Sequence, residues 1–151
     1  GGIQMNDNSF RSVRILLVED SEADIILLKE VFETVKIKNE LSVVRDGSEA
    51  LEFLNKTDKY KNSETPDLIF LDLNIPRVSG HEVLTMLKSN QELSYIPVVI
   101  LTTSNSIEDV RKAYSNHANC FITKPMNIED FVNIVKSIKH FWFDIVRLPS
   151  K

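Results

Sequence analysis

The chain has 151 residues, with 18 lysines and arginines against 22 aspartates and glutamates and a formal net charge of −4. This length is typical of one domain with a single hydrophobic core. The acidic excess and the lack of a basic stripe argue against direct nucleic-acid binding. A single cysteine, Cys120, excludes an internal disulfide, and no apolar stretch is long enough to cross a bilayer. We therefore expect a cytoplasmic protein.

The N-terminal residues are polar and lack the apolar core of a signal peptide. Gly1–Gln4 precede Met5 and are typical of residues left over from cloning, so we expect residues 1–12 to be a disordered or cloning-derived N-terminus. One domain is expected over residues 13–140. Residues 141–151 then form a separate aromatic C-terminal extension.

Five short apolar runs are spaced along the chain, and each is rich in valine, isoleucine, leucine or phenylalanine. Unbroken runs of this kind are typical of strands that are buried on both faces of a parallel sheet. The predicted strands are Arg14–Glu19, Leu41–Arg45, Asp67–Asp72, Pro97–Thr102 and Asn119–Thr123.

Helical patterns fill the gaps between these runs and follow the last one. Ser21 with Asp24 is typical of a capping pair at a helix start, and this first helix is expected to run to about Lys36. The other four helices are predicted to start after Asp46-Gly47-Ser48, after Gly80, near Ser106 and after Asn127.

Strict alternation of strands and helices favours right-handed crossovers, with helices on both faces of a parallel sheet. We therefore predict an α/β protein with a doubly wound, flavodoxin-like, five-stranded sheet, five helices and the C-terminal extension. The common strand order for such a sheet is 2-1-3-4-5. In this order the ends of the first and third strands, which carry Asp20 and Asp72, flank a crevice.

Charged residues follow three of the predicted strands. Glu19 and Asp20 end the first, Asp72 ends the third and Lys124 follows the fifth, so all four are expected at one edge of the sheet. Crowded carboxylates repel one another, and a hard divalent ion such as Mg²⁺ relieves this repulsion. Asp72 is the best candidate to attack a phosphoryl group, while the metal and Lys124 neutralise the phosphoryl oxygens.

Four sequence blocks carry a family resemblance. In this order they resemble the signature of the response regulator receiver domain, and the similarity extends from about Val13 to His140. The blocks are Val18-Glu19-Asp20, Leu71–Pro76 with Gly80, Leu101-Thr102-Thr103 and Phe121–Pro125.

The resemblance implies that Asp72 accepts a phosphoryl group from a phosphohistidine of a sensor kinase. It also implies that Mg²⁺ is held by Glu19, Asp20, Asp72 and the backbone carbonyl of Asn74. Such a protein is not an enzyme in the usual sense, because it catalyses only its own phosphorylation and slow dephosphorylation. The position of Asn74 modulates this dephosphorylation in the family.

The resemblance further implies a switch pair, Thr102 and Phe121. A phosphoryl oxygen would attract the Thr102 hydroxyl and leave room for the Phe121 ring to turn toward the core. The output surface is then formed by the fourth helix, the fifth strand and the fifth helix. Lys124 is expected to be oriented by a cis bond to Pro125, and Thr103 stands where the family often has a smaller residue.

The C-terminal extension contains consecutive aromatic residues after a core that is already complete. It resembles the ending of single-domain regulators that pair with phytochrome-type sensor kinases, which implies a homodimer formed through this region. The alternative is that these side chains fold back on their own domain. The candidate interface residues are Phe141, Trp142, Phe143 and Leu148.

The functional prediction is a stand-alone receiver that switches a contact with an unknown downstream protein. One alternative, an aspartyl-phosphate phosphohydrolase, also uses a strand-end aspartate and Mg²⁺, but its family pattern has a second aspartate where Asn74 stands. A receiver-like adaptor that works without phosphorylation is disfavoured because no site residue is missing. A flavodoxin-type cofactor binder would need a phosphate loop after the first strand, which is absent from the sequence.

Overall fold

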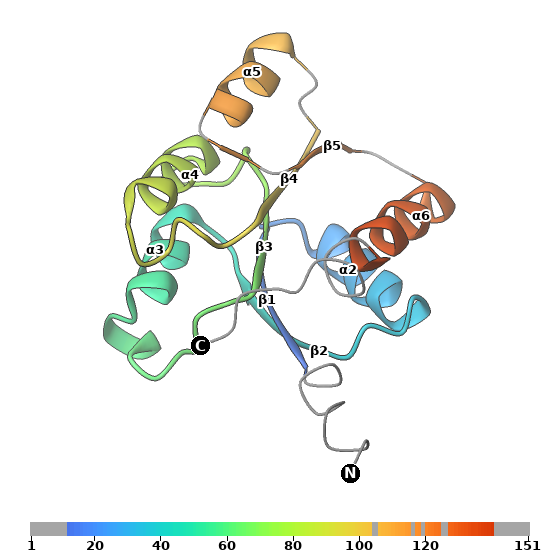
Figure 1. Cartoon of the computed structure of the whole chain (residues 1–151), viewed down its shortest axis with the longest axis horizontal. Helices are drawn as coiled ribbons and strands as arrows, with labels where there is room; N and C mark the ends of the chain where they lie inside the picture. Colours follow the sequence, from blue (N-terminus) through green and yellow to red (C-terminus); the bar gives the residue numbers. More distant parts are fainter. Residues whose placement is uncertain (1–11, 104–105, 116, 119, 125–126, 141–151) are drawn as a thin grey trace.

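The computed structural model describes residues 12–103, 106–115, 117–118, 120–124 and 127–140. Strands and helices alternate along the chain as the sequence predicts (Figure 1). The elements are β1 (Val13–Val18), α2 (Glu22–Thr34), β2 (Asn39–Val44), α3 (Gly47–Asn55), the 3₁₀ turn η2 (Asp58–Tyr60), β3 (Leu68–Leu71), α4 (Gly80–Ser89), β4 (Val98–Thr102), α5 (Ile107–Ser115), β5 (Cys120–Thr123) and α6 (Ile128–Lys139).

The strands form one five-stranded sheet in the order β2-β1-β3-β4-β5, and every pairing is parallel. Helices α2 and α6 cover one face, and α3, α4 and α5 cover the other (Figure 1). The predicted doubly wound fold and its strand order are therefore confirmed. Strands β1 and β3 are neighbours, with Val18 opposite Leu71, so their carboxyl ends lie side by side.

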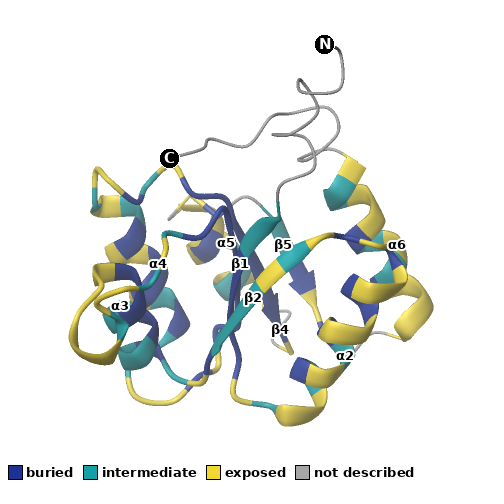
Figure 2. Cartoon of the chain, turned by 90° about the horizontal axis from the view of Figure 1, so that it is seen from below, coloured by how far each residue is buried: buried dark blue, intermediate teal, exposed yellow. Residues whose placement is uncertain are grey.

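Two hydrophobic clusters fill the space between the sheet and its helices. Alternate residues of β1 point to opposite faces, so Leu16 and Val18 belong to one cluster while Ile15 and Leu17 belong to the other. The inner strands are buried on both sides, as Figure 2 shows. This packing explains why the strands appear in the sequence as unbroken apolar runs.

Each α-helix in the described part of the chain begins at a polar cap, and the sequence analysis identified Ser21 as the first of these caps. In each case the side chain of the cap residue accepts a hydrogen bond from the backbone N–H three residues later, which satisfies one of the free donors of the first turn. The cap residues are Ser21, Asp46, Ser79, Ser106 and Asn127.

Gly80 is required where α4 approaches the end of β3. A Cβ atom at this position would lie 2.5 Å from the backbone oxygen of Asp72 and 2.5 Å from Cα of Leu73. The backbone N–H of Gly80 also donates to the Leu73 carbonyl over 3.1 Å. The close approach fixes the start of α4 against the segment that carries Asp72.

Some of the sequence expectations concern residues outside the described part of the chain. These are the N-terminal residues 1–11, Pro125 and the proposed interface residues Phe141, Trp142, Phe143 and Leu148. Within the described residues, no helix is both long enough and apolar enough to span a membrane.

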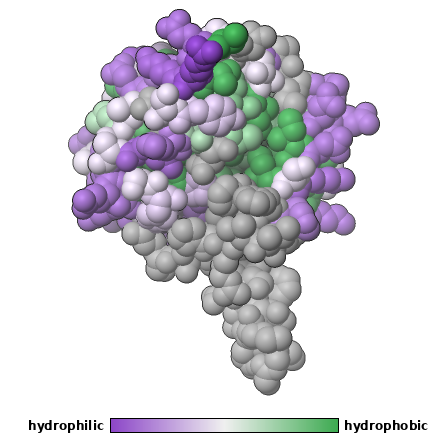
Figure 3. Space-filling model, turned by 45° about the horizontal axis from the view of Figure 1, so that its top comes forward, coloured by the Kyte–Doolittle hydropathy of each residue, from purple (hydrophilic) through white to green (hydrophobic). Residues whose placement is uncertain are grey.

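The surface of the described domain is mainly hydrophilic on the face seen in Figure 3, with hydrophobic side chains gathered in one area. Several large hydrophobic side chains are exposed, and three of them lie on α5 and α6: Ile107 is 69% exposed, Tyr114 48% and Ile128 49%. These two helices belong to the output surface that the family resemblance implies.

Candidate functional site

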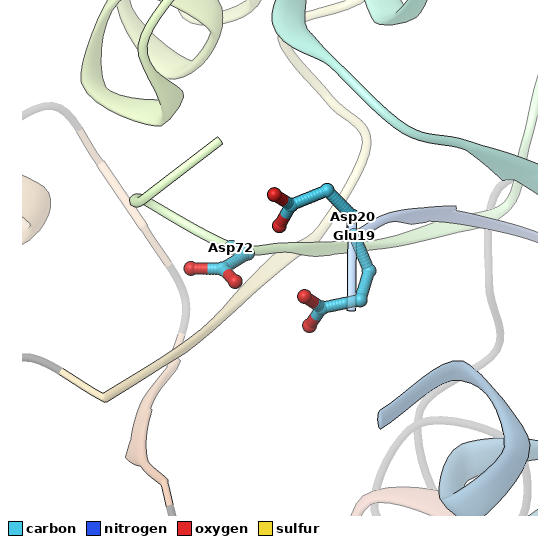
Figure 4. A group of neighbouring side chains, drawn as sticks. All are labelled: Glu19, Asp20 and Asp72. Carbon is cyan, nitrogen blue, oxygen red and sulfur yellow. The ribbon is translucent and has the colours of Figure 1, made fainter. Parts of the chain in front are cut away.

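The ends of β1 and β3 bring three carboxylates together. Because Val18 lies opposite Leu71, the residues that follow them leave the sheet at the same level. One carboxylate oxygen each from Glu19, Asp20 and Asp72 lies within 4.8 Å of the other two. Figure 4 shows these side chains turned toward a common space, as the sequence analysis expects.

Burial makes this cluster electrostatically unfavourable without a cation. Glu19 is fully buried and Asp72 is 5% exposed, whereas Asp20 is exposed. Burial, aided by the neighbouring Asp72 and only partly offset by Lys124, raises the pKa of Glu19 to about 7. Oxygen ligands in this number and of this charge fit a hard divalent cation.

Lys124 contacts three acidic side chains. It is 5% exposed, and its Nζ donates to Glu19 Oε1 over 2.7 Å, to Asp24 Oδ2 over 2.7 Å and to Asp72 Oδ2 over 3.3 Å. Burial disfavours the ammonium, but the hydrogen bonds to Asp24 and Glu19 outweigh this effect and raise the pKa of Lys124. The lysine therefore remains charged among the carboxylates.

Asp24 is a residue of this site that the sequence analysis did not assign to it. The sequence identified Asp24 only as part of the capping pair of the first helix, and its backbone N–H does donate to Ser21 Oγ over 3.3 Å. Its carboxylate, however, points to Lys124. The sequence did contain a signal for this position, because the first turn of α2, which carries Asp24, follows directly after the strand-end acids Glu19 and Asp20.

Asn74 connects Asp72 to the end of β4. Its backbone N–H donates to Asp72 Oδ1 over 2.9 Å, and its side-chain Nδ2 donates to Thr102 Oγ1 over 2.9 Å. A longer contact of 3.5 Å joins Nδ2 to Thr103 Oγ1. Thr102 is fully buried, and Asn74 links its hydroxyl to the Asp72 carboxylate. Metal binding by the Asn74 carbonyl stays a prediction.

Phe121 lies on the neighbouring strand, β5. It pairs with Ile100 of β4, and its half-buried ring packs against the core cluster on the side of α3, α4 and α5. Thr102 is two residues beyond Ile100, so the two proposed switch residues lie on adjacent strands. A change of the Phe121 ring between two positions stays a prediction.

Comparison with known proteins agrees with the fold and the site. Residues 15–136 match the family model of the response regulator receiver domain. Response regulator Rcp1 of Synechocystis sp. is 47% identical over 146 residues, which cover 97% of this chain and 99% of Rcp1. No enzyme family is indicated by these matches.

Two solved structures are also similar. The phosphorylated cyanobacterial phytochrome response regulator RcpA has a TM-score of 0.86 and 44% identity, covering 93% of this chain and 100% of RcpA. The Mn²⁺-bound form of Rcp1 has a TM-score of 0.84 and 47% identity, covering 91% of this chain and 99% of that structure. The acidic cluster described above fits the divalent-metal binding of such relatives. The chain belongs to the response regulator receiver domain family.

Proposed function

We propose that the protein is a stand-alone receiver in which Asp72 accepts a phosphoryl group from a sensor histidine kinase, of the phytochrome type, in the presence of Mg²⁺. The observation that supports this most directly is the grouping of Asp72 with Glu19, Asp20 and the ammonium of Lys124 at one sheet edge. Phosphoryl transfer needs a nucleophile and fixed positive charge at one point, and this cluster offers both.

The chemistry follows from the contacts of Asp72. One carboxylate oxygen forms the new P–O bond while the P–N bond of the phosphohistidine breaks, and its electron pair stays on the imidazole nitrogen. Asn74 N–H binds Asp72 Oδ1 and orients the carboxylate, and Lys124 stabilises the charge of the phosphoryl oxygens. Bound Mg²⁺, with Glu19, Asp20, Asp72 and the Asn74 carbonyl as candidate ligands, would supply further positive charge.

Phosphorylation would then be read out at Thr102. Its hydroxyl accepts a hydrogen bond from the Asn74 side chain, and a phosphoryl oxygen on Asp72 offers it a new acceptor. Movement of Thr102 toward that oxygen makes room for the Phe121 ring, which biases the surface of α5, β5 and α6. The exposed Ile107, Tyr114 and Ile128 on this surface support a protein contact as the output.

The contacts of Asn74 also argue against a phosphohydrolase. An aspartyl-phosphate phosphohydrolase needs a general acid or base at this position, and a carboxamide is too weak an acid and too weak a base for that role. Here the amide donates to Thr102.

The test of the receiver function is incubation with Mg²⁺ and acetyl phosphate, followed by intact mass spectrometry of wild type and Asp72→Asn.

Mg²⁺ affinity is expected to rise about tenfold from about pH 6 to about pH 8. Because burial raises the pKa of Glu19 to about 7, this residue is mostly protonated at the lower pH and must lose its proton before it can bind the metal. Isothermal titration calorimetry across this range measures the effect. Glu19→Gln should bind Mg²⁺ more weakly and lose the pH dependence; an affinity in wild type that does not change with pH would contradict the assignment.

We further propose that the chain forms a homodimer through Phe141, Trp142, Phe143 and Leu148. The support comes from the sequence alone. Consecutive aromatic residues follow a domain whose core is already complete, and a second copy of the chain would shield their apolar surface from water. Sedimentation equilibrium should give a dimer mass for the full chain and a monomer mass for the chain cut after His140. A monomer mass for both would disprove the dimer and favour folding back on the domain.

A further inference from the structure

We propose that Asp24 is a positioning residue that restrains Lys124 in the unphosphorylated protein and thereby opposes phosphoryl transfer to Asp72. The inference rests on the proposed function and deepens it. It assigns to the first turn of α2 a part in setting how readily the receiver is phosphorylated.

The contacts of Lys124 are the starting point. An ammonium group has three N–H donors, and Lys124 directs its Nζ to Asp24 and Glu19 over 2.7 Å each and to Asp72 over 3.3 Å. Its contact with the nucleophile is therefore the longest of the three. To move closer to a phosphoryl oxygen on Asp72, the lysine must lengthen at least one of its two short contacts, with Asp24 or with Glu19.

Asp24 is the partner that Lys124 can release at the lowest cost. Glu19 is fully buried, so its carboxylate would lose a charged partner without gaining water. The side chain of Asp24 is 31% exposed, and water can solvate it when the lysine leaves. Asp24 also lies outside the group of acids that converges on the candidate metal position.

The charges of the site support the same inference. The ammonium of Lys124 contacts the carboxylates of Glu19, Asp24 and Asp72, and the exposed Asp20 adds a further carboxylate to the cluster. An incoming phosphoryl group is itself negative. Asp24 adds a second negative charge near the phosphoryl group. It also binds the Lys124 ammonium, the cation that would stabilise that group. Removal of the Asp24 charge should therefore accelerate phosphorylation through both effects.

The chain contains a matched control in the same helical turn. Glu22 and Asp24 are both acids in the first turn of α2, so each interacts with the positive end of the helix dipole. Glu22, however, pairs with the exposed Arg45 over 2.8 Å, on the surface of the protein. Glu22→Gln thus removes an equal charge from the same turn without removing a partner of Lys124.

The experiment measures the rate of phosphoryl adduct formation with Mg²⁺ and acetyl phosphate by intact mass. Asp24→Asn is expected to react roughly fivefold faster than wild type, as for the loss of one ion pair in which only the carboxylate is partly exposed. Asp24→Glu, which keeps the charge, should return toward the wild-type rate, and Glu22→Gln should match wild type. Asp24→Ala provides a second variant should the amide impair folding. Structural damage alone would slow the reaction, so impaired folding cannot explain an increase.

The possible results separate this inference from the proposed function. A rate for Asp24→Asn equal to or below wild type, or an equal acceleration in Glu22→Gln, overturns the role of Asp24 while the receiver function stands. If wild type forms no adduct, or if Asp72→Asn forms the same adduct, the proposed function itself fails.

Discussion

Asp72→Asn is expected to abolish the phosphoryl adduct that wild type forms with Mg²⁺ and acetyl phosphate. Asp72 combines a buried carboxylate, an N–H donor from Asn74 that orients it and the neighbouring ammonium of Lys124. The amide of asparagine keeps the shape of the side chain but is a very weak nucleophile, so the P–O bond cannot form at this position. Intact mass spectrometry should show one added phosphoryl group in wild type and none in the variant.

Strand β3 offers a matched control for this experiment. Asp67 precedes the strand as Asp72 follows it, and it is similarly buried, at 6% exposed. Its carboxylate accepts a hydrogen bond from the backbone N–H of Arg14 over 2.9 Å, at the opposite end of the sheet from the candidate site. Asp67→Asn should therefore still form the adduct. An adduct that persists in Asp72→Asn would place the nucleophile elsewhere.

Lys124→Met is expected to lower the free energy of unfolding by about 3–5 kcal/mol. This value applies without Mg²⁺ and at a pH high enough to ionise Glu19. The side chain of Lys124 is 6% exposed, and its removal leaves the buried carboxylates of Glu19 and Asp72 without a cation. Urea unfolding measures the loss. Addition of Mg²⁺ should restore part of it, because the metal replaces the missing positive charge.

The sign of the pH effect on this variant follows from Glu19. Burial raises the pKa of Glu19 to about 7 even though Lys124 lowers it, so loss of the lysine should raise this pKa further. As the pH falls, Glu19 in the variant takes up a proton and its unpaired charge disappears. The destabilisation by Lys124→Met should therefore shrink as the pH falls.

An exposed lysine provides the control. Lys59 pairs with Glu49 over 3.3 Å but is 68% exposed, and Lys59→Met should change stability little. An equal loss in both variants would argue against a special role of the buried lysine.

Much of the fold follows from local signals. The runs around Leu16 and Phe70 are apolar throughout because both faces of these strands are covered. The helix starts at Ser21 and Ser106 are visible because a capping side chain binds a backbone N–H only three residues away. The strand order came from the preference of five-stranded sheets for 2-1-3-4-5. Parallel strands then bring their carboxyl ends to one edge, which is why the sequence alone groups Glu19, Asp20, Asp72 and Lys124.

The contacts within the site needed the folded chain. Asp24 and Lys124 are far apart in the sequence, and the bond between them depends on how α2 packs beside the end of β5. The contact of Asn74 with Thr102 likewise joins the loop after β3 to the last residue of β4. A sequence pattern indicates the face on which a side chain lies, but not the partner that it meets across the fold. For this protein the amino-acid sequence was enough to identify the family, the strand order and the acids of the site. The partners of Lys124 became known only from the packing of distant elements, because those distances depend on the positions of whole helices and strands rather than on the local chain.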